Sequence, residues 1–287
     1  MTRTVLITGC SSGIGAATAR LFAAEGWNVV ATARRPAAME PLAVYPQVLR
    51  LALDVQDEAG IAASVAAGIE RFGQIDLLVN NAGFSLFGLF EGTSPAKIRE
   101  QFDVNLFGVM AVTRAILPHF RRNKAGLIIN VSSGAGLFTL PLLSMYCASK
   151  FALEGFTEAL AYELAAQNIG IKLIEPHGGV SSTAFGARVT EEVKAQAADS
   201  GIDAGALHLA DYDRFVTATH AAFDEMRAQR MMSADDVAAV ILAAATDGTD
   251  RLRYPVGDDA RGFVKARREK TDQDYVDFMR ARFRPKG

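Results

Sequence analysis

The chain has 287 residues, of which 50% are hydrophobic and 22% charged, and its formal net charge is −2. This balance leaves no strong field, which argues against a nucleic acid or a membrane as the partner. The longest apolar run, residues 237–245, is well short of the roughly 18 residues that span a bilayer, and residues 5–7 are too short for a signal-peptide core. Cys10 and Cys147 form neither a CxxC pair nor a metal-type pair, so no disulfide or metal site is indicated. We expect a cytoplasmic protein.

Short strand-like runs alternate with longer helical patterns along the chain. One helical stripe, for example, consists of Ile61, Val65, Ile69 and Phe72. Helices are predicted over residues 95–123 and 144–167, and another begins at Ser233. The strand-like runs are 4–8, 28–33, 48–53, 76–80, 126–132, 169–175 and 253–256. This alternation predicts an α/β fold in which residues 1–287 form one doubly wound domain around a seven-stranded parallel sheet.

Two regions depart from this rhythm. Residues 184–232 carry no strand signal, and they follow the sixth predicted strand, beside the carboxyl ends of the sheet. We expect a mobile helical lid over the substrate there; the alternative is a fixed element that packs on the fold. Residues 259–287 are rich in Arg and Lys but amphipathic, which favours a solvated helix or a subunit contact.

A glycine-rich turn joins the first predicted strand to the first helix. Residues 8–15 read Thr-Gly-Cys-Ser-Ser-Gly-Ile-Gly. The glycines permit a tight turn and a close approach to a phosphate, and the helix N-terminus offers free N–H groups. The GxxxGxG spacing is neither GxGxxG nor a Walker loop, and a plain strand–helix turn would also use glycines. The position of this turn favours a dinucleotide site.

The end of the second predicted strand indicates which dinucleotide. Sites for NAD carry an acidic residue here that binds the ribose 2′-hydroxyl, whereas an arginine accommodates the 2′-phosphate of NADP. This chain has Arg34 and Arg35, 19 and 20 residues after Gly15, and no carboxylate. A solvated pair of arginines before Pro36 is the alternative. The arrangement predicts NADP(H).

Several motifs in register resemble the short-chain dehydrogenase/reductase family. They are TGxxxGIG at residues 8–15, NNAG at 80–83, Asn105, Ser133, Tyr146-x-x-x-Lys150 and Pro176, and the resemblance covers about residues 3–183. It implies a Rossmann domain, hydride transfer to or from a nicotinamide, and a homodimer or homotetramer. The cofactor-binding residues expected on this basis are Gly9, Ser11, Ser12, Ile14, Arg34, Asp54, Val55, Asn81, Gly83, Tyr146, Lys150, Pro176 and Val180. Asp54 has a structural alternative, a carboxylate that caps a turn.

Tyr146 and Lys150 are four residues apart on a predicted helix and therefore share one face. We expect the lysine ammonium to bring the pKa of the phenol, normally near 10, toward neutrality, so that Tyr146 acts as acid or base. The resemblance adds Lys150 as a ribose contact, Ser133 as a donor to the developing alkoxide, and Asn105 as support for a proton relay. Strand alternation turns Ser132 away, and a buried structural amide is the alternative for Asn105.

The segment after the sixth predicted strand departs from the family pattern. His177 stands where glycine is expected, and one extra residue precedes Thr183. This puts the contact with the nicotinamide carboxamide through Val180 or Thr183 in doubt. His177 is either a hydrogen-bonding group at the substrate site or a spacer without a catalytic role.

These features predict an NADP(H)-dependent oxidoreductase that interconverts a carbonyl and a secondary alcohol, with an apolar ketone or aldehyde as substrate. The chain looks similar to hydroxysteroid and retinol dehydrogenases and to bacterial ketoreductases. The alternatives are a non-catalytic NADP-binding sensor or scaffold, and a lyase or epimerase on the same fold. The expected substrate walls, which could instead be core, are Phe84, Leu86, Phe87, Leu137, Phe138, Met145 and Phe185.

Overall fold

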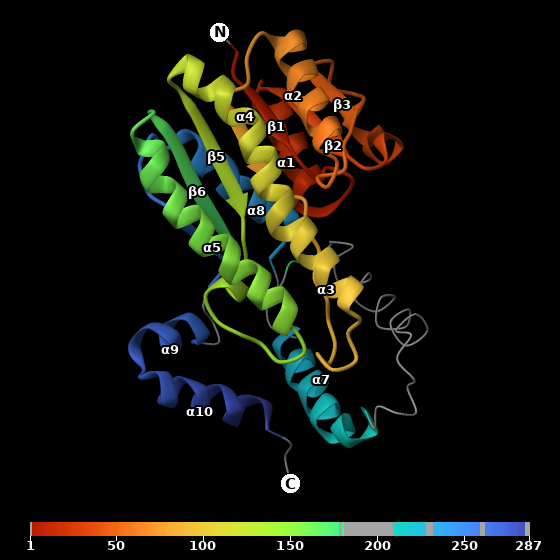
Figure 1. Cartoon of the computed structure of the whole chain (residues 1–287), viewed down its shortest axis with the longest axis vertical. Coiled ribbons are helices and arrows are strands. Elements are labelled where there is room, and N and C mark those ends of the chain that lie inside the picture. Colours follow the sequence, from red (N-terminus) through yellow and green to blue (C-terminus); the bar gives the residue numbers. More distant parts are fainter. Residues whose placement is uncertain (1, 178–179, 181–208, 228–231, 259–261, 285–287) are drawn as a thin grey trace.

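The sheet of the computed structural model, which describes residues 2–177, 180, 209–227, 232–258 and 262–284, has seven parallel strands. Their order, β3-β2-β1-β4-β5-β6-β7, reverses direction at β1, as in a doubly wound domain (Figure 1). The strands are β1 (Thr4–Ile7), β2 (Asn28–Ala33), β3 (Val48–Ala52), β4 (Leu77–Asn80), β5 (Gly126–Val131), β6 (Ile169–Pro176) and β7 (Arg253–Val256). The predicted fold class is confirmed.

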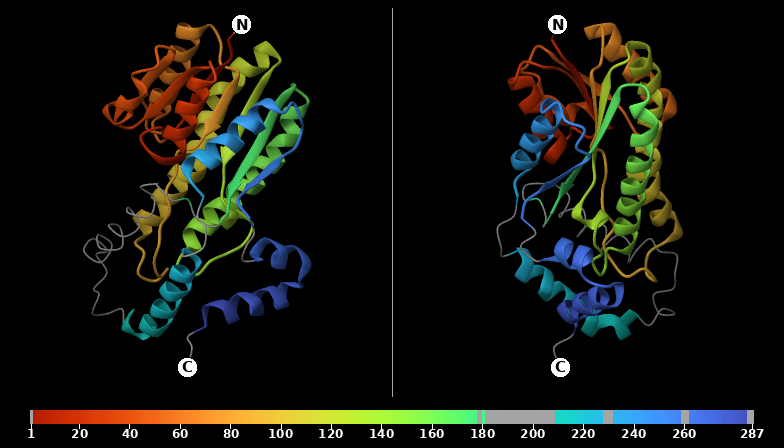
Figure 2. Two further views of the ribbon diagram at one scale, coloured as in Figure 1. Left: turned by 180° about the vertical axis from the view of Figure 1, so that it is seen from behind. Right: turned by 90° about the vertical axis from the view of Figure 1, so that its left-hand side faces the viewer.

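Helices cover both faces of the sheet (Figure 2). Val5 and Ile7 of β1 belong to the core cluster that also contains Phe22 of α1 (Gly13–Ala24) and Val237 of α8 (Ala234–Thr246). Leu6 points the other way, toward the side of α2 (Glu58–Phe72), α4 (Val109–Asn123) and α5 (Ser144–Ala165). Because both faces are buried, the strands are apolar at successive positions rather than alternating. In the described part of the chain, none of the helices has the length and apolar character needed to cross a bilayer.

The helix predicted over residues 95–123 is interrupted. Ser94 caps α3 (Pro95–Phe102) by accepting from the Lys97 N–H, and a π-helical turn, Asp103–Gly108, then leads into α4. Gly108 packs closely on Val55, since a Cβ at this glycine would lie 2.7 Å from the valine Cγ2. π-Turns inside helices often occur at functional sites, and this one carries Asn105.

A small helical lobe lies beyond the carboxyl ends of the strands (Figures 1 and 2). It contains a 3₁₀-helix (Leu209–Tyr212), α7 (Asp213–Arg227), α9 (Phe263–Glu269) and α10 (Asp272–Phe283). The side chains of α7, α9 and α10 pack on one another and on the segment after β5. The buried residues of this cluster are Phe87, Phe138, Leu142, Ala222, Phe223, Met226, Phe263, Val264, Ala266, Tyr275, Met279 and Phe283.

This lobe bears on two expectations. The basic C-terminal region forms amphipathic helices, because one face of α9 and α10 is buried in the lobe while the arginines are exposed on the other, and a subunit contact through that exposed face stays a prediction. The expected lid, residues 184–232, lies partly outside the described residues, namely at 184–208 and 228–231. Its described helix, α7, packs on α10 through Phe223 and Phe283, whose ring centroids are 5.7 Å apart.

Phe263 joins the C-terminal helices to the segment after β5. Its ring lies 5.2 Å from that of Phe138, and only 2% of the residue is exposed. We expect Phe263→Ala to lower the free energy of unfolding by about 3 kcal/mol, because the substitution leaves a cavity in the lobe. Urea denaturation measures the change. Phe90→Ala is the control, since Phe90 is 61% exposed, and an equal loss in both variants would contradict the packing role.

Candidate active site

The three side chains with predicted acid–base and carbonyl-binding roles meet at the carboxyl end of β5. Ser133 follows this strand, and its hydroxyl hydrogen-bonds the phenol of Tyr146 on α5. One turn further along α5, Lys150 donates from Nζ to the carbonyl oxygen of Val131 at 2.9 Å, and the same Nζ lies 5.8 Å from the centroid of the Tyr146 ring. Ser133, Tyr146 and Lys150 therefore lie close together, as the sequence predicts.

A short 3₁₀-turn, Gly134–Gly136, holds Ser133 against α5. The Ser133 Oγ accepts from the Ala135 N–H at 3.1 Å and so caps this turn. Gly136 touches α5 directly, because a Cβ there would lie 2.8 Å from Glu154 Cγ and 3.1 Å from the Lys150 carbonyl oxygen. A larger residue at position 136 would push the turn away from the helix. The close contact fixes Ser133 relative to Tyr146.

Burial dominates the electrostatics of the site. It raises the pKa of Tyr146 to about 12, against an opposing effect of the Ser133 hydrogen bond. It lowers the pKa of Lys150 to about 8, and the negative charge of Glu154 partly offsets this change. The expected fall of the phenol pKa toward neutrality is therefore wrong for the charges of this chain alone. Desolvation penalises the phenolate more than the neighbouring groups stabilise it.

Asn105, in the π-helical turn, is fully buried and its amide is used structurally. Its Oδ1 accepts from the Phe84 N–H at 3.0 Å, and its Nδ2 donates to the Phe84 carbonyl at 2.8 Å and to Ser149 Oγ at 3.2 Å. These bonds tie the segment after β4 to α5, three residues after Tyr146. Asn105 is thus a buried structural amide, as the alternative interpretation expects, and its role in a proton relay stays a prediction.

The glycine turn after β1 fits a dinucleotide phosphate. Gly9 has φ +75°, and a Cβ at Gly15 would lie 2.3 Å from the Gly9 carbonyl oxygen, so both positions require glycine. Asn81 Nδ2 holds the turn by donating to the carbonyls of Thr8 and Gly9 at 2.9 and 3.2 Å. The turn also carries Ser11, Ser12 and Ile14.

The N-terminus of α1 is open to an anion. Its N-cap, Ser12, makes no side-chain cap, and its first turn has no acidic residue. Side chains of Asp57, Ser94, Ser233 and Thr271 do cap α2, α3, α8 and α10. The residues present therefore fit a pyrophosphate, which Gly-rich turns and helix N-termini bind through backbone N–H groups.

The other predicted cofactor residues lie at neighbouring strand ends. Arg34 is exposed after β2 and pairs with no carboxylate among the described residues. Gly83 is exposed after β4, where a Cβ would lie 3.2 Å from Asn105 Oδ1. Asp54 uses Oδ1 to accept from the Gln56 N–H at 3.1 Å, which is the turn-capping alternative.

The remaining cofactor positions are less exposed. Val55, beside Asp54, is buried under Gly108. Pro176 ends β6, and Val180 forms an isolated bridge with Met232 and packs beside Ile14. Residues 178–179 and 181–183 of the irregular segment lie outside the described residues.

His177 lies at the edge of the site. A Cβ at Gly134, next to Ser133, would be 3.0 Å from its Cδ2, and the imidazole meets the Phe138 ring edge-on at 6.4 Å. It is 8% exposed. This histidine packs behind the turn that carries Ser133.

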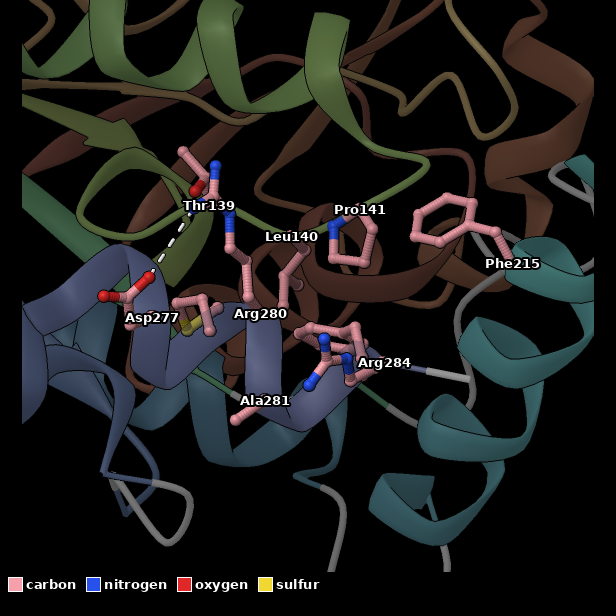
Figure 3. A pocket seen from close by; sticks show the side chains of 10 residues that line it. Thr139, Leu140, Pro141, Phe215, Asp277, Arg280, Ala281 and Arg284 are labelled. Carbon is pink, nitrogen blue, oxygen red and sulfur yellow. Dashed lines mark ion pairs between the residues drawn. The ribbon is translucent and has the colours of Figure 1, made fainter. Parts of the chain in front are cut away.

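A groove opens between the segment after β5 and the helical lobe (Figure 3). Its volume is about 780 Å³, and it is lined by Thr139, Leu140, Pro141, Phe215, Asp277, Met279, Arg280, Ala281, Phe283 and Arg284. Arg280 pairs with Asp277 at 3.5 Å at its edge. The backbone of Leu140 also hydrogen-bonds the side chain of Cys147, the neighbour of Tyr146.

The expected substrate walls divide into two groups. Leu86, Phe87 and Phe138 are buried, and the two phenylalanines belong to the core of the lobe, which is the structural alternative for them. The partly exposed residues of the set are Phe84, Leu137 and Met145. Phe185 lies outside the described residues.

One group of buried charges near the site was not anticipated. Glu154, on α5, is 5% exposed, and Glu175, on β6, is 1% exposed; both contact Arg253 of β7. Glu154 lies four residues after Lys150, so the helical spacing that paired Tyr146 with Lys150 also placed a carboxylate next along the same face.

Comparisons with known proteins agree with this geometry. The family described as short chain dehydrogenase matches residues 3–194. An uncharacterized oxidoreductase of Schizosaccharomyces pombe is 35% identical over 85% of this chain and 96% of its own length. Human retinol dehydrogenase 8 is 40% identical over 72% of this chain and 67% of its own length.

Solved structures show the same architecture. A short-chain dehydrogenase/reductase of Burkholderia phymatum in complex with NAD has a TM-score of 0.75 and 26% identity, with 93% of each chain covered. ElxO with NADP bound has a TM-score of 0.69 and 25% identity over 89% of this chain and 98% of its own. With the family match and the serine–tyrosine–lysine site, the chain belongs to the short-chain dehydrogenases, oxidoreductases that use a nicotinamide cofactor and act on small molecules.

Proposed function

We propose that this protein is an NADP(H)-dependent reductase of an apolar ketone or aldehyde. The observation that carries the proposal is the buried phenol of Tyr146, whose pKa of about 12 keeps it protonated at neutral pH beside the Ser133 hydroxyl. A protonated phenol is a proton donor for a carbonyl oxygen that gains negative charge. The same group is a poor base near neutrality, so the site is better suited to reduction than to oxidation.

Each of the three side chains has its own task. A bound nicotinamide supplies the hydride. Tyr146 donates its proton to the carbonyl oxygen, and the Ser133 hydroxyl hydrogen-bonds the same oxygen, which stabilises the developing alkoxide. Lys150, anchored on the Val131 carbonyl, presents a positive charge beside the phenol and binds a ribose hydroxyl. The burial of Tyr146 and Lys150 excludes water, which strengthens these interactions.

The proposed choice of NADP(H) rests on Arg34. This side chain is exposed at the end of β2, and no carboxylate of the described residues competes for its guanidinium. An arginine binds a phosphate with a planar set of donors. Since the similar structures include one with NAD and one with NADP, the arginine supplies the argument for the phosphate.

The groove beside Leu140 supports an apolar substrate. Its walls include Pro141, Phe215 and Phe283, and it adjoins the segment between Ser133 and Tyr146 (Figure 3). The likeness to human retinol dehydrogenase 8, whose named substrate is apolar, agrees with this assignment. We place the apolar part of the substrate between this segment and the helical lobe, with α7 as one wall.

We also propose a homodimer or homotetramer. Large side chains are exposed on α5 and on the π-helical turn that contacts it, namely Phe151, Tyr162 and Phe107, with exposed fractions of 38%, 73% and 55%. Exposed apolar side chains on adjoining elements favour an interface between subunits there.

Tyr146→Phe removes the proton donor and keeps the ring. We expect kcat for NADPH-dependent ketone reduction to fall by at least about two orders of magnitude, while the Kd of NADPH changes by no more than a few-fold. Stopped-flow or steady-state absorbance of NADPH measures the rate. Tyr162→Phe, an exposed tyrosine on the same helix, should keep full activity. Normal turnover in Y146F would refute the role of Tyr146.

The two reaction directions should depend differently on pH. Reduction needs the phenol protonated, which a pKa of about 12 ensures throughout the working range, so its rate should fall only as Lys150 loses its proton, with a pKa of about 8. Alcohol oxidation needs the phenolate, whose fraction grows about tenfold per pH unit below the pKa, and its optimum should lie at higher pH. Initial rates in both directions between about pH 6 and 9.5 test this expectation. Identical profiles would exclude Tyr146 as the titrating group.

Arg34→Asp replaces a phosphate partner with a like charge. We expect a loss of NADPH affinity of about ten- to a hundred-fold, since a charge-assisted hydrogen bond contributes about 1.5–3 kcal/mol. NADH affinity should change much less because NADH lacks the 2′-phosphate. Fluorescence titration measures both, with Arg122→Asp, an exposed arginine at the end of α4, as the control. A wild-type preference for NADH would overturn the cofactor assignment.

A further inference from the structure

Three carboxylates surround one arginine behind the active site. The Arg253 Nε lies 3.1 Å from Glu154 Oε2 and 3.3 Å from Glu175 Oε1, and its Nη2 lies 2.6 Å from Glu158 Oε2. The Glu154 and Glu175 side chains are 7% and 1% exposed, whereas that of Glu158 is 45% exposed. Two buried carboxyls thus share a single guanidinium group, an arrangement that is costly unless one of the two takes up a proton.

Glu154 is the member of this cluster that faces the active site. It follows Lys150 by one helical turn on α5, and Tyr146 precedes Lys150 by one turn, so the three side chains share one face. Its Cγ packs against Gly136, in the turn that Ser133 caps, and the Ser132 hydroxyl lies beside its carboxyl group.

The groups around Glu154 come from four elements. Arg253 lies on β7, Glu175 on β6, Ser132 at the end of β5, and Lys150 and Glu158 on α5. The positive charges of Arg251 and Arg268 lower the pKa of Glu175. Lys150 in turn is faced by the Val131 carbonyl of β5 and by Tyr146 and Glu154 of its own helix.

The cluster divides its charge unevenly. Burial and the neighbouring Glu154 raise the pKa of Glu175 to about 7, so Glu175 takes up a proton near neutrality. Burial also raises the pKa of Glu154, but the Ser132 hydroxyl, Arg253 and Lys150 all oppose this shift. Glu154 also makes the direct hydrogen bond with Arg253 Nε, whereas Glu175 makes only the longer ionic contact. The carboxylate next to Lys150 is therefore the one with the more direct stabilising contacts.

We propose that Glu154, held by Arg253, is a positioning residue whose buried carboxylate keeps Lys150 in its ammonium form. Without this charge, burial alone would favour the neutral amine and weaken both actions of Lys150, the field at Tyr146 and the contact with a ribose hydroxyl. The second of these consequences rests on the proposed function; the protonation state of Lys150 does not.

The protonation of Lys150 can be measured directly in the whole protein. The chain has eight lysines, so ¹³C-labelled lysine gives few side-chain signals in NMR, and Lys150→Arg assigns the one of interest. The wild-type signal should titrate with a pKa of about 8. In Glu154→Gln the midpoint should fall by about one pH unit, because a nearby opposite charge has been removed.

Glu158→Gln is the matched control. Glu158 lies one turn further along α5 and pairs with the same arginine, but it is exposed and adds nothing to the charge beside Lys150. In Glu158→Gln the titration midpoint of Lys150 should equal that of the wild type. In Glu154→Asp, which keeps the negative charge, the Lys150 midpoint should lie close to the wild-type value. If circular dichroism shows that E154Q does not fold, Glu154→Leu removes the same charge without burying an amide.

Two outcomes would overturn the proposal. One is an unchanged Lys150 midpoint in the neutral Glu154 variants. The other is a fall of the Lys150 midpoint in E158Q as large as that in E154Q, because the loss of any carboxylate paired with Arg253 would then have the same effect. A second readout is the Kd of NADPH from its fluorescence, which should weaken between pH 7 and 9 by several-fold more in E154Q than in the wild type. If the wild type binds no NADPH, the proposed function fails, while the lysine titration still decides the role of Glu154.

Discussion

The hydrogen bond from Lys150 Nζ to the Val131 carbonyl oxygen is the contact on which the site depends. It joins the second turn of α5 to the last residue of β5, and it satisfies one donor of a buried ammonium that would otherwise be costly. Because it fixes α5 against β5, Ser133 falls opposite Tyr146, one helical turn before the lysine. The same anchoring removes Lys150 and Tyr146 from water. Burial then raises the pKa of the phenol and lowers the pKa of the ammonium relative to exposed side chains.

Buried amide side chains hold the surrounding strand ends in register. Asn80, at the end of β4, donates to Asn130 Oδ1 on β5 at 2.9 Å, and Asn130 donates to Thr157 Oγ1 on α5 at 2.9 Å. Asn81 ties the glycine turn after β1 to the end of β4, and Asn105 ties α5 to the segment that follows β4. Hydrogen bonds of this kind are directional, so they place the backbone more accurately than apolar packing alone does. The glycine turn and the serine–tyrosine–lysine site are therefore joined through one network of hydrogen bonds.

The serine–tyrosine–lysine site and the apolar groove are built from different parts of the molecule. Tyr146 and Lys150 come from α5 and Ser133 follows β5, whereas the groove lies between the segment after β5 and the helical lobe. Phe138 links the two parts, since it follows Ser133 by five residues and packs on Phe263 of α9. Changes in α7 or α10 can therefore alter the groove while the sheet and its site stay in place, which is how one fold accommodates many substrates.

The sequence by itself determined the α/β class, the strand positions and the proximity of Tyr146 and Lys150, because these follow from short apolar runs, from the 3.6-residue period of the helices between them and from local turn chemistry. It did not show the π-helical turn around Asn105, since a one-residue change in hydrogen bonding leaves the hydrophobic pattern nearly intact. The placement of Glu154, Glu175 and Arg253 in one buried cluster was decided only by tertiary structure. These residues lie on three elements up to 99 positions apart in the chain, and charges act through space rather than along the sequence. The pKa values of Tyr146 and Lys150 depended on the fold for the same reason, because desolvation is a property of the assembled core and not of any local motif.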